Sequence, residues 1–222
     1  MIILNIDTAV ETSSICLSEN NISLGVKINP SQKDSAAWID VAIKELLEER
    51  NLSFKQLDAI AVSEGPGSYT GLRVGMATSK GLCYALQKPL ITVNTLKIMA
   101  AAGQKVSSCL LCPMIDARRM EVFTAVFDHE LNFVLPYNNL VLTENSFSDL
   151  LDQEKVLFFG NGSVKFQSII KHRNSVFRKL DITAEDMILL SSEKFSKKEF
   201  ADLAYSQPFY GKEFYSPSKQ SL

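Results

Sequence analysis

Asp7 has the clearest position for chemistry, because it directly follows an apolar segment that reads as a strand. Together with Thr8 it opens the turn DTAVETSS. In phosphate-binding hairpins, an aspartate at this place holds a metal ion and backbone amides bind the phosphate. Such hairpins need glycine where the backbone approaches the phosphate, whereas residues 9–11 here are Ala-Val-Glu and add a negative charge. We interpret Asp7 and Thr8 as a degenerate phosphate hairpin in which Asp7 caps the turn.

Residues of the kind that build hydrolase sites do not cluster in the sequence. The histidines are His129 and His172, and no HxxxH, HExxH or GxSxG pattern supplies a catalytic or metal site. Cys109 and Cys112 have metal-like spacing, but they lie in a segment that reads as a strand, where positions three apart face opposite sides. The sequence therefore predicts no metal ion and no catalytic residue.

The stretch SEGPGSYTGLRVGMATSKG, residues 63–81, is the most unusual part of the sequence. Glycines and a proline follow a hydrophobic strand and run into an expected helix from about Thr70 to Gln87. No lysine stands at the helix start, as a P-loop would require. We interpret the loop as shaping the start of a helix that is held for a neighbouring protein. The residues of this loop are Glu64, Gly65, Pro66, Gly67, Ser68, Tyr69 and Thr70.

Two expected helices carry apolar or small residues outside the stripes that face the core. On the glycine-rich helix, small residues recur on one face, where another backbone could approach closely, beside a narrow polar stripe that includes Arg73. On the helix at residues 35–50, a tryptophan outside the core stripe is a natural interface anchor. We predict that both helices meet a partner protein, with the second half of the chain as the alternative cover. The predicted interface consists of Trp38, Val41, Gly71, Arg73, Gly75, Thr78 and Leu82.

This interface has a direct consequence for one of its glycines. If Gly75 lies where two helix backbones meet, Gly75→Leu should weaken pairing by ~1–3 kcal/mol. The monomer should stay folded, because on this view the face is exposed to solvent when no partner is bound.

The expected elements describe an α/β protein with two similar lobes. Three strands, a helix, a strand, the glycine-rich helix, a strand and a helix predict a mixed sheet with helices packed against it. The pattern then loosely repeats, so we divide the chain into lobes at 1–104 and 105–222. The last segment is expected to be helical to about Tyr205, to pack back on the first lobe, and to end in docked aromatic residues. These aromatic residues are Phe209, Tyr210 and Phe214.

Composition sets limits on the partners and the compartment. The formal net charge of −2 and the pI near 5.8 give no overall attraction to nucleic acid. The start MIILNIDTAVE lacks the basic leader of a signal peptide, and no apolar run approaches the ~20 residues of a membrane span. We expect a cytoplasmic protein that does not enter a membrane.

Three segments together resemble the TsaB (YeaZ) family: ILNIDTAVETSS, AVSEGPGSYTGLRVGMATSKGL and IDARRMEVFTAVFD. The resemblance runs nearly end to end and includes the tail QPFYGKEF. It implies an actin-like ASKHA (ribonuclease H-like) fold of two similar lobes, each a mixed sheet flanked by helices. It also implies a non-catalytic subunit that activates threonylcarbamoylation of the tRNA adenosine next to the anticodon.

The resemblance further implies the partners. A TsaB-type protein pairs with its paralogue TsaD through its first two helices, forms a homodimer by the same surface when alone, and is joined by the ATPase TsaE. Transfer RNA is then reached only through the complex. TsaD carries metal-binding histidines on the helix that corresponds to residues 35–50, and the matching positions 34–38 here hold no histidine.

Two other functions remain as alternatives. A small ATP-binding kinase-like enzyme of the same superfold would need a second glycine-containing phosphate hairpin, and DARRM has no glycine. A glycoprotease-like metallohydrolase would need the missing metal ligands. We therefore expect no cofactor, with weak or partner-dependent nucleotide binding left open.

Overall fold

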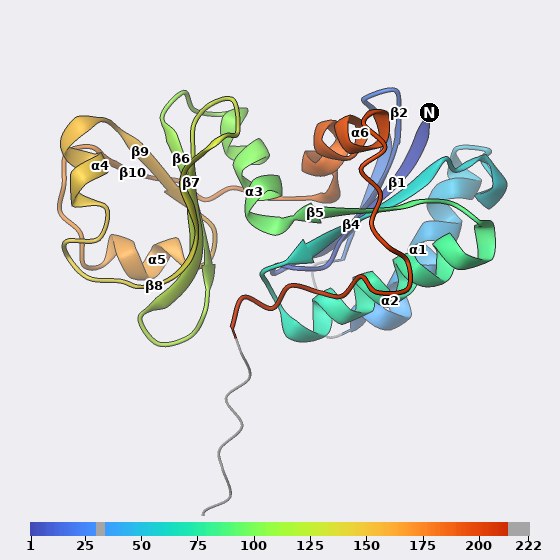
Figure 1. The fold of residues 1–222 in the computed structure, drawn as a ribbon, viewed down its shortest axis with the longest axis horizontal. Coiled ribbons are helices and arrows are strands. Elements are labelled where there is room, and N and C mark those ends of the chain that lie inside the picture. The colour runs from blue at the N-terminus through green and yellow to red at the C-terminus, as the bar shows by residue number, and fades with distance from the viewer. Residues whose placement is uncertain (30–33, 213–222) are drawn as a thin grey trace, which may run out of the picture.

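The computed structural model describes residues 1–29 and 34–212 (Figure 1), so Phe214 lies outside the described residues. The first half forms a five-stranded sheet in the order β3-β2-β1-β4-β5. Strands β1 to β3 are antiparallel neighbours, whereas β4 and β5 run parallel to β1. The strands are β1 (Ile2–Asp7), β2 (Ser13–Glu19), β3 (Ile22–Asn29), β4 (Ala59–Gly65) and β5 (Leu90–Asn94).

The second half repeats this topology. Its sheet has the order β10-β9-β6-β7-β8, with β6 to β8 antiparallel and β9 and β10 parallel to β6. The expected fold of two similar lobes, each with a mixed sheet, is confirmed. The strands are β6 (Leu110–Asp116), β7 (Glu121–Phe127), β8 (Phe133–Val141), β9 (Val156–Phe159) and β10 (Ser175–Phe177).

Helices α1 and α2 cover one face of the first sheet, as Figure 1 shows. The stripe of α1 that includes Ile39, Ile43 and Leu46 is buried, as its helical spacing predicts. The Ser68 side chain caps α2 by accepting a hydrogen bond from the Gly71 N–H. The helices are α1 (Ser35–Glu49), α2 (Tyr69–Leu86), α3 (Thr95–Gln104), α4 (Ser148–Gln153), α5 (Ser163–Gln167) and α6 (Ile188–Ser196), with 3-10 turns η2 (Phe54–Gln56) and η3 (Ala184–Met187).

One hydrophobic core joins the two lobes. It contains residues of both sheets, such as Ile91 and Phe159, together with most of α3, which lies between the sheets in Figure 1. The boundary drawn at residue 104 falls at the end of α3. Beyond the second sheet the chain returns to the first lobe, where the Ser191 hydroxyl donates to Asn5 Oδ1 at 2.6 Å.

The C-terminal part differs from its predicted helix. Helix α6 ends at Ser196 instead of continuing to Tyr205, because Lys198 adopts a left-handed conformation with φ 55°. Ala201 then pairs with Leu90 beside the first sheet, and the following residues run along α2 without regular structure (Figure 1). Within the described part of the chain, no helix has the length and apolar character needed to cross a membrane.

Candidate functional site

Asp7 lies in the protein interior at the end of β1. Its side chain is fully buried, and Oδ1 accepts a hydrogen bond from the Ala9 N–H at 3.0 Å, which confirms the predicted role as a turn cap. The other oxygen, Oδ2, has no partner within hydrogen-bond distance. Burial raises the pKa of the Asp7 carboxyl, and the charge of Asp186 adds to this effect. Burial thus disfavours the charged carboxylate, the form that binds metal ions.

The neighbouring Thr8 ties the same turn to helix α2. Its hydroxyl donates to the Gly71 carbonyl oxygen at 2.7 Å, and its N–H donates to Ser63 Oγ at 3.4 Å. The turn that the sequence analysis interpreted as a degenerate phosphate hairpin is therefore occupied by contacts within the chain itself.

The glycine-rich loop is also held by its own chain, on both sides. The Ser68 N–H donates to the Ala9 carbonyl oxygen at 2.7 Å, and a Cβ on Gly67 would lie 2.3 Å from that oxygen. On the other side, the Phe209 N–H donates to the Glu64 carbonyl oxygen at 2.7 Å. A Cβ on Gly65, at φ +119°, would lie 1.9 Å from the Phe209 carbonyl oxygen. The glycines of this loop are required by contacts inside the chain.

The prediction that Gly71 and Gly75 form an open face for a partner is wrong. Both residues are buried. A Cβ on Gly71 would come within 2.0 Å of the Thr8 carbonyl oxygen, and one on Gly75 would come within 2.3 Å of Thr8 Oγ1. The close approach that these glycines allow is therefore between α2 and the β1–β2 turn. The helical spacing was interpreted correctly, but the segment that approaches the two glycines is the chain's own β1–β2 turn.

Arg73 is exposed and contacts the chain's own C-terminal segment. Its Nε donates to the Tyr210 hydroxyl at 3.1 Å, and its guanidinium lies 4.4 Å from the centroid of the Tyr69 ring. Lys80, in the same polar stripe, donates to the carbonyl oxygens of Ala204 and Ser206. We call residues 204–212 the C-terminal strap. The predicted docking of Phe209 and Tyr210 is confirmed by these contacts.

Trp38 and Val41 do not lie beside the exposed face of α2. They share a row of α1 with Glu45, whose carboxylate accepts a hydrogen bond from Lys27 of β3 at 2.9 Å. That row is the edge of α1 that faces β3, whereas α2 covers β4 on the other side. Trp38 is half-buried against the core of the first lobe, and Val41 is 56% exposed. The structure thus does not bring the seven predicted interface residues together.

One solvent-facing surface of α2 is free of charged side chains. It includes Thr78, from the predicted set, whereas Leu82 lies further round the helix; Leu82, like Val74 at the edge of this surface, is half-buried against the core. A Cβ on Gly81 would meet no atom within 4 Å, so this glycine is open to solvent. Sequence reasoning missed this surface because it centred the interface on Gly71 and Gly75, which are buried. We call it the α2 face; its residues are Thr70, Val74, Ala77, Thr78, Gly81, Tyr84 and Ala85.

A cavity of about 760 Å³ lies between the lobes. It is bordered by the β1–β2 turn, by the residues that follow β9, and by the segment 177–183. Glu11 and Asp181 line it, whereas Asp7 does not. Among the described residues, no three His, Cys, Asp or Glu side chains lie close enough together to hold a metal ion.

The comparisons with known proteins identify the family. A family model described as TsaD, tRNA N6-adenosine threonylcarbamoyltransferase, matches residues 16–206. The tRNA threonylcarbamoyladenosine biosynthesis protein TsaB of Bacillus subtilis is 31% identical over 176 residues, which are 77% of this chain and 76% of that protein. The chain belongs to the TsaB (YeaZ) family. TsaB of Escherichia coli is 26% identical over 219 residues, which are 95% of this chain and 94% of the relative.

The fold comparison agrees with TsaB membership. The structure of YeaZ from Pseudomonas aeruginosa has a TM-score of 0.80, with 24% sequence identity, and the alignment covers 95% of this chain and 100% of that one. The actin-like ASKHA fold expected from the sequence is thereby confirmed. Membership in the TsaB family connects the chain with the biosynthesis of threonylcarbamoyladenosine on tRNA.

Proposed function

We propose that the chain is a non-catalytic subunit that activates the threonylcarbamoylation of tRNA adenosine next to the anticodon. It pairs with a TsaD-type transferase through the first two helices, and a TsaE-type ATPase joins the complex. Alone, it pairs with a second copy by the same surface. Because tRNA is modified in the cytoplasm, this role places the chain there.

The α2 face is the observation that carries this proposal. Charged residues make up 22% of the chain, yet the seven positions of the α2 face, of which Val74 and Thr78 are half-buried and the others exposed, hold none. Interface cores are depleted of charged residues in the same way, and a contiguous uncharged patch on a surface helix marks a contact site. The adjoining start of α1 adds exposed Ala36 and Ala37. We therefore place the centre of the proposed interface at Ala77 and Gly81 instead of at Gly71 and Gly75.

The state of Asp7 supports a role without catalysis. In a metal-dependent enzyme, the aspartate at the end of the first strand would reach the cavity between the lobes. Here its carboxyl group caps Ala9 in the interior, does not line that cavity, and has its pKa raised by burial. Glu11 lines the cavity where a phosphate would need positive charge or backbone N–H groups.

Reconstitution with the cognate TsaD-type protein tests the proposal. The wild-type chain should form a complex and support tRNA modification, whereas Ala77→Arg on the α2 face should abolish both. Val134→Arg is the matched control, because Val134 is 39% exposed on β8 in the other lobe and does not line the cavity between the lobes. A wild-type chain that neither binds the transferase nor alters the level of the modified nucleoside would contradict the proposed function.

A further inference from the structure

The tight turn between β6 and β7 carries two adjacent arginines in an unusual backbone conformation. Arg118 and Arg119 have φ values of 69° and 48°, both in the left-handed region. Turns of this kind favour asparagine and glycine, because other side chains crowd the backbone at positive φ. The turn between β2 and β3 meets the same demand with Asn20 and Asn21, at φ 48° and 71°. The fold therefore needs positive φ at the β6–β7 turn, but it does not need arginine there.

The acidic groups near this turn are already paired with lysines. Asp116 accepts hydrogen bonds from Lys165 Nζ at 2.6 Å and from the Arg118 backbone N–H at 2.5 Å. Glu121 forms an ion pair with Lys212 of the C-terminal strap. In the described part of the chain, neither arginine guanidinium has a hydrogen-bond or ion-pair partner. The arginines act on these acids at longer range: Arg118 contributes to the lowered pKa of Asp116, and Arg119 to that of Glu121.

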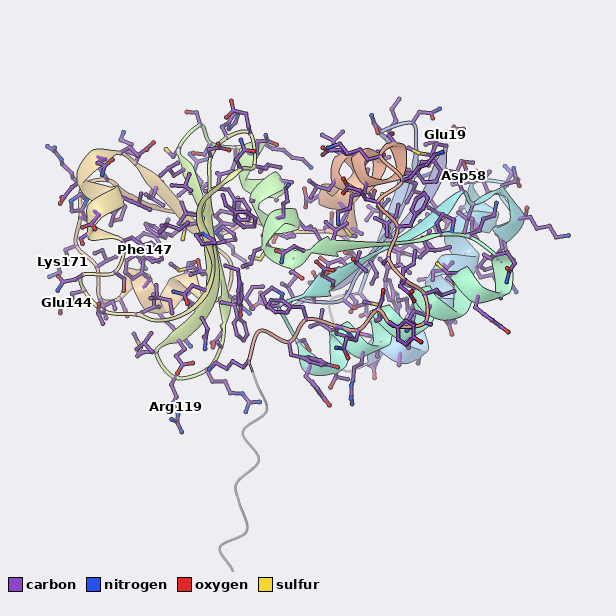
Figure 2. All side chains as sticks on the ribbon, viewed as in Figure 1. Glu19, Asp58, Arg119, Glu144, Phe147 and Lys171 are labelled. Atoms are coloured by element: carbon purple, nitrogen blue, oxygen red, sulfur yellow. The ribbon has the colours of Figure 1, made fainter. Side chains whose placement is uncertain are left out.

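The result is a local positive charge on an acidic protein. Four basic side chains against two acidic ones leave an excess of two positive charges at the turn, whereas the whole chain has a net charge of −2. Both arginines are exposed. In Figure 2, the Arg119 side chain extends away from the tip of the hairpin, on the same lower side of the molecule as α2 in Figure 1. The tip therefore projects on the same side as the helix that we propose as the partner-binding element.

We propose that the Arg118–Arg119 turn binds the phosphodiester backbone of the tRNA in the complex. This inference rests on the proposed function and adds a direct RNA contact to it. Guanidinium groups pair with phosphate oxygens through two parallel N–H donors, and a projecting turn with two of them can contact adjacent phosphates. Such contacts position the RNA without reading its sequence. An acidic protein surface is the competing ligand, and the experiment separates the two.

The test measures tRNA binding by the complex of this chain with its TsaD-type partner, across a range of salt concentrations. The variant is Arg118→Asn with Arg119→Asn, because asparagine suits the left-handed turn and the fold should not suffer. Each lost phosphate contact lowers the slope of log K against log salt by roughly 0.7–0.9. Between 50 and 200 mM salt, affinity of the wild-type complex should therefore fall about tenfold more than affinity of the variant.

The control removes the same number of charges elsewhere on the second lobe. Lys171 and Arg173 are exposed, and Figure 2 places Lys171 at the outer edge of that lobe, far from Arg119. Lys171→Asn with Arg173→Asn should leave the salt slope unchanged. An arginine variant with the wild-type slope and affinity overturns the proposal while leaving the proposed function intact.

Two other outcomes also overturn it. If the arginine variant no longer assembles with the transferase in size-exclusion chromatography, the turn is a protein contact and not an RNA contact. If the wild-type chain neither assembles with the transferase nor supports modification, the proposed function fails and this inference fails with it.

Discussion

Gly75 of α2 lies directly against Thr8 of the β1–β2 turn, so that a Cβ on the glycine would come within 2.3 Å of Thr8 Oγ1. Thr8 is itself fully buried and bonded to the Gly71 carbonyl oxygen. The helix and the turn can approach this closely only because the helix carries glycine at both positions. The contact links the start of α2 to the turn that follows β1, which the sequence analysis interpreted as a degenerate phosphate hairpin.

Gly75→Ala should therefore destabilise the monomer itself. The added methyl group must displace Thr8 or α2, and overpacking of this kind costs ~1–3 kcal/mol of unfolding free energy. Urea unfolding followed by circular dichroism measures the loss. In a Thr8→Ala background the same substitution should cost less, because the clashing hydroxyl is gone. Equal costs in the two backgrounds would show that Thr8 is not the obstacle.

Gly81 should behave in the opposite way. No atom lies within 4 Å of the position of its Cβ, so Gly81→Ala should stabilise the helix by up to ~1 kcal/mol. Gly81→Leu should leave the fold intact but weaken both the homodimer and the complex with the transferase. A steric cost of ~1–3 kcal/mol corresponds to a rise in dissociation constant of roughly fivefold to 150-fold. Sedimentation velocity measures the homodimer, and unchanged association of Gly81→Leu would contradict the placement of the interface.

Periodicity and element order predicted most of the fold, because they depend on local pattern. The bounds of α2 and the buried stripe of α1 follow from the spacing of apolar residues, and the repeated order of strands and helices follows from the alternation of periods. The end of α6 was missed because Lys198 leaves the helix in a left-handed conformation that no glycine or proline marks. The conformation of the C-terminal residues is then determined by their contacts with α2, and not by a helical or strand pattern in their own sequence.

The site was harder to predict for a physical reason. A glycine on a helix face indicates a close approach, but the sequence does not say which backbone approaches. For Gly71 and Gly75 the approaching segment is Thr8, more than sixty positions earlier in the chain. The contact of Arg73 could not be predicted for the same reason, because its partner Tyr210 lies 137 positions away in the sequence. Contacts of such separation depend on the assembled fold.

The end of the C-terminal strap, residues 209–212, should detach when its contact with Arg73 is removed, whereas residues 204–206 stay bound to Lys80. Arg73 bonds the Tyr210 hydroxyl, and Tyr210 packs against Tyr69 with ring centroids 5.0 Å apart. Arg73→Ala should therefore speed chymotrypsin cleavage after Phe209 and Tyr210 severalfold. Cleavage after Tyr205, which is 85% exposed, serves as the internal control and should hardly change. Equal protection of the strap in both proteins would mean that its backbone bond to Glu64 suffices.

Only one of the four cysteines should react quickly in the native protein. Burial raises the pKa of Cys16 to about 11, and those of Cys83 and Cys112 to about 12, so their thiolate forms are rare at neutral pH. Cys109 is half-buried just before β6. Titration with a chromogenic disulfide at pH 8 should show one fast thiol, and Cys109→Ser should remove it. Two or more fast thiols would contradict the burial of the other three.

The buried carboxyl group of Asp7 should make stability depend on pH in a way that Asp7→Asn removes. Its folded-state pKa is raised above the unfolded value of 3.8, so the folded state holds the proton more tightly. The associated stability is fully present below pH 3.8 and is lost as the pH rises through the folded pKa. Asparagine keeps the acceptor for the Ala9 N–H but carries no charge. The stability of Asp7→Asn relative to wild type should therefore increase with pH, by about 1.4 kcal/mol for each unit of pKa shift.

Asp116→Asn gives the matched control with the opposite sign. Burial acts to raise the pKa of Asp116. The hydrogen bonds from Lys165 and from the Arg118 N–H lower it, and together they outweigh burial, so the net shift is downward. This carboxylate stabilises the fold above pH 3.8 and loses that effect as the pH falls through its lowered pKa, so Asp116→Asn should be destabilised most at neutral pH. Urea unfolding of the three proteins between pH 4 and pH 8 compares the two slopes. A pH-independent difference between Asp7→Asn and wild type would show that Asp7 titrates as it does in the unfolded chain, and that its place at the end of β1 is open to water.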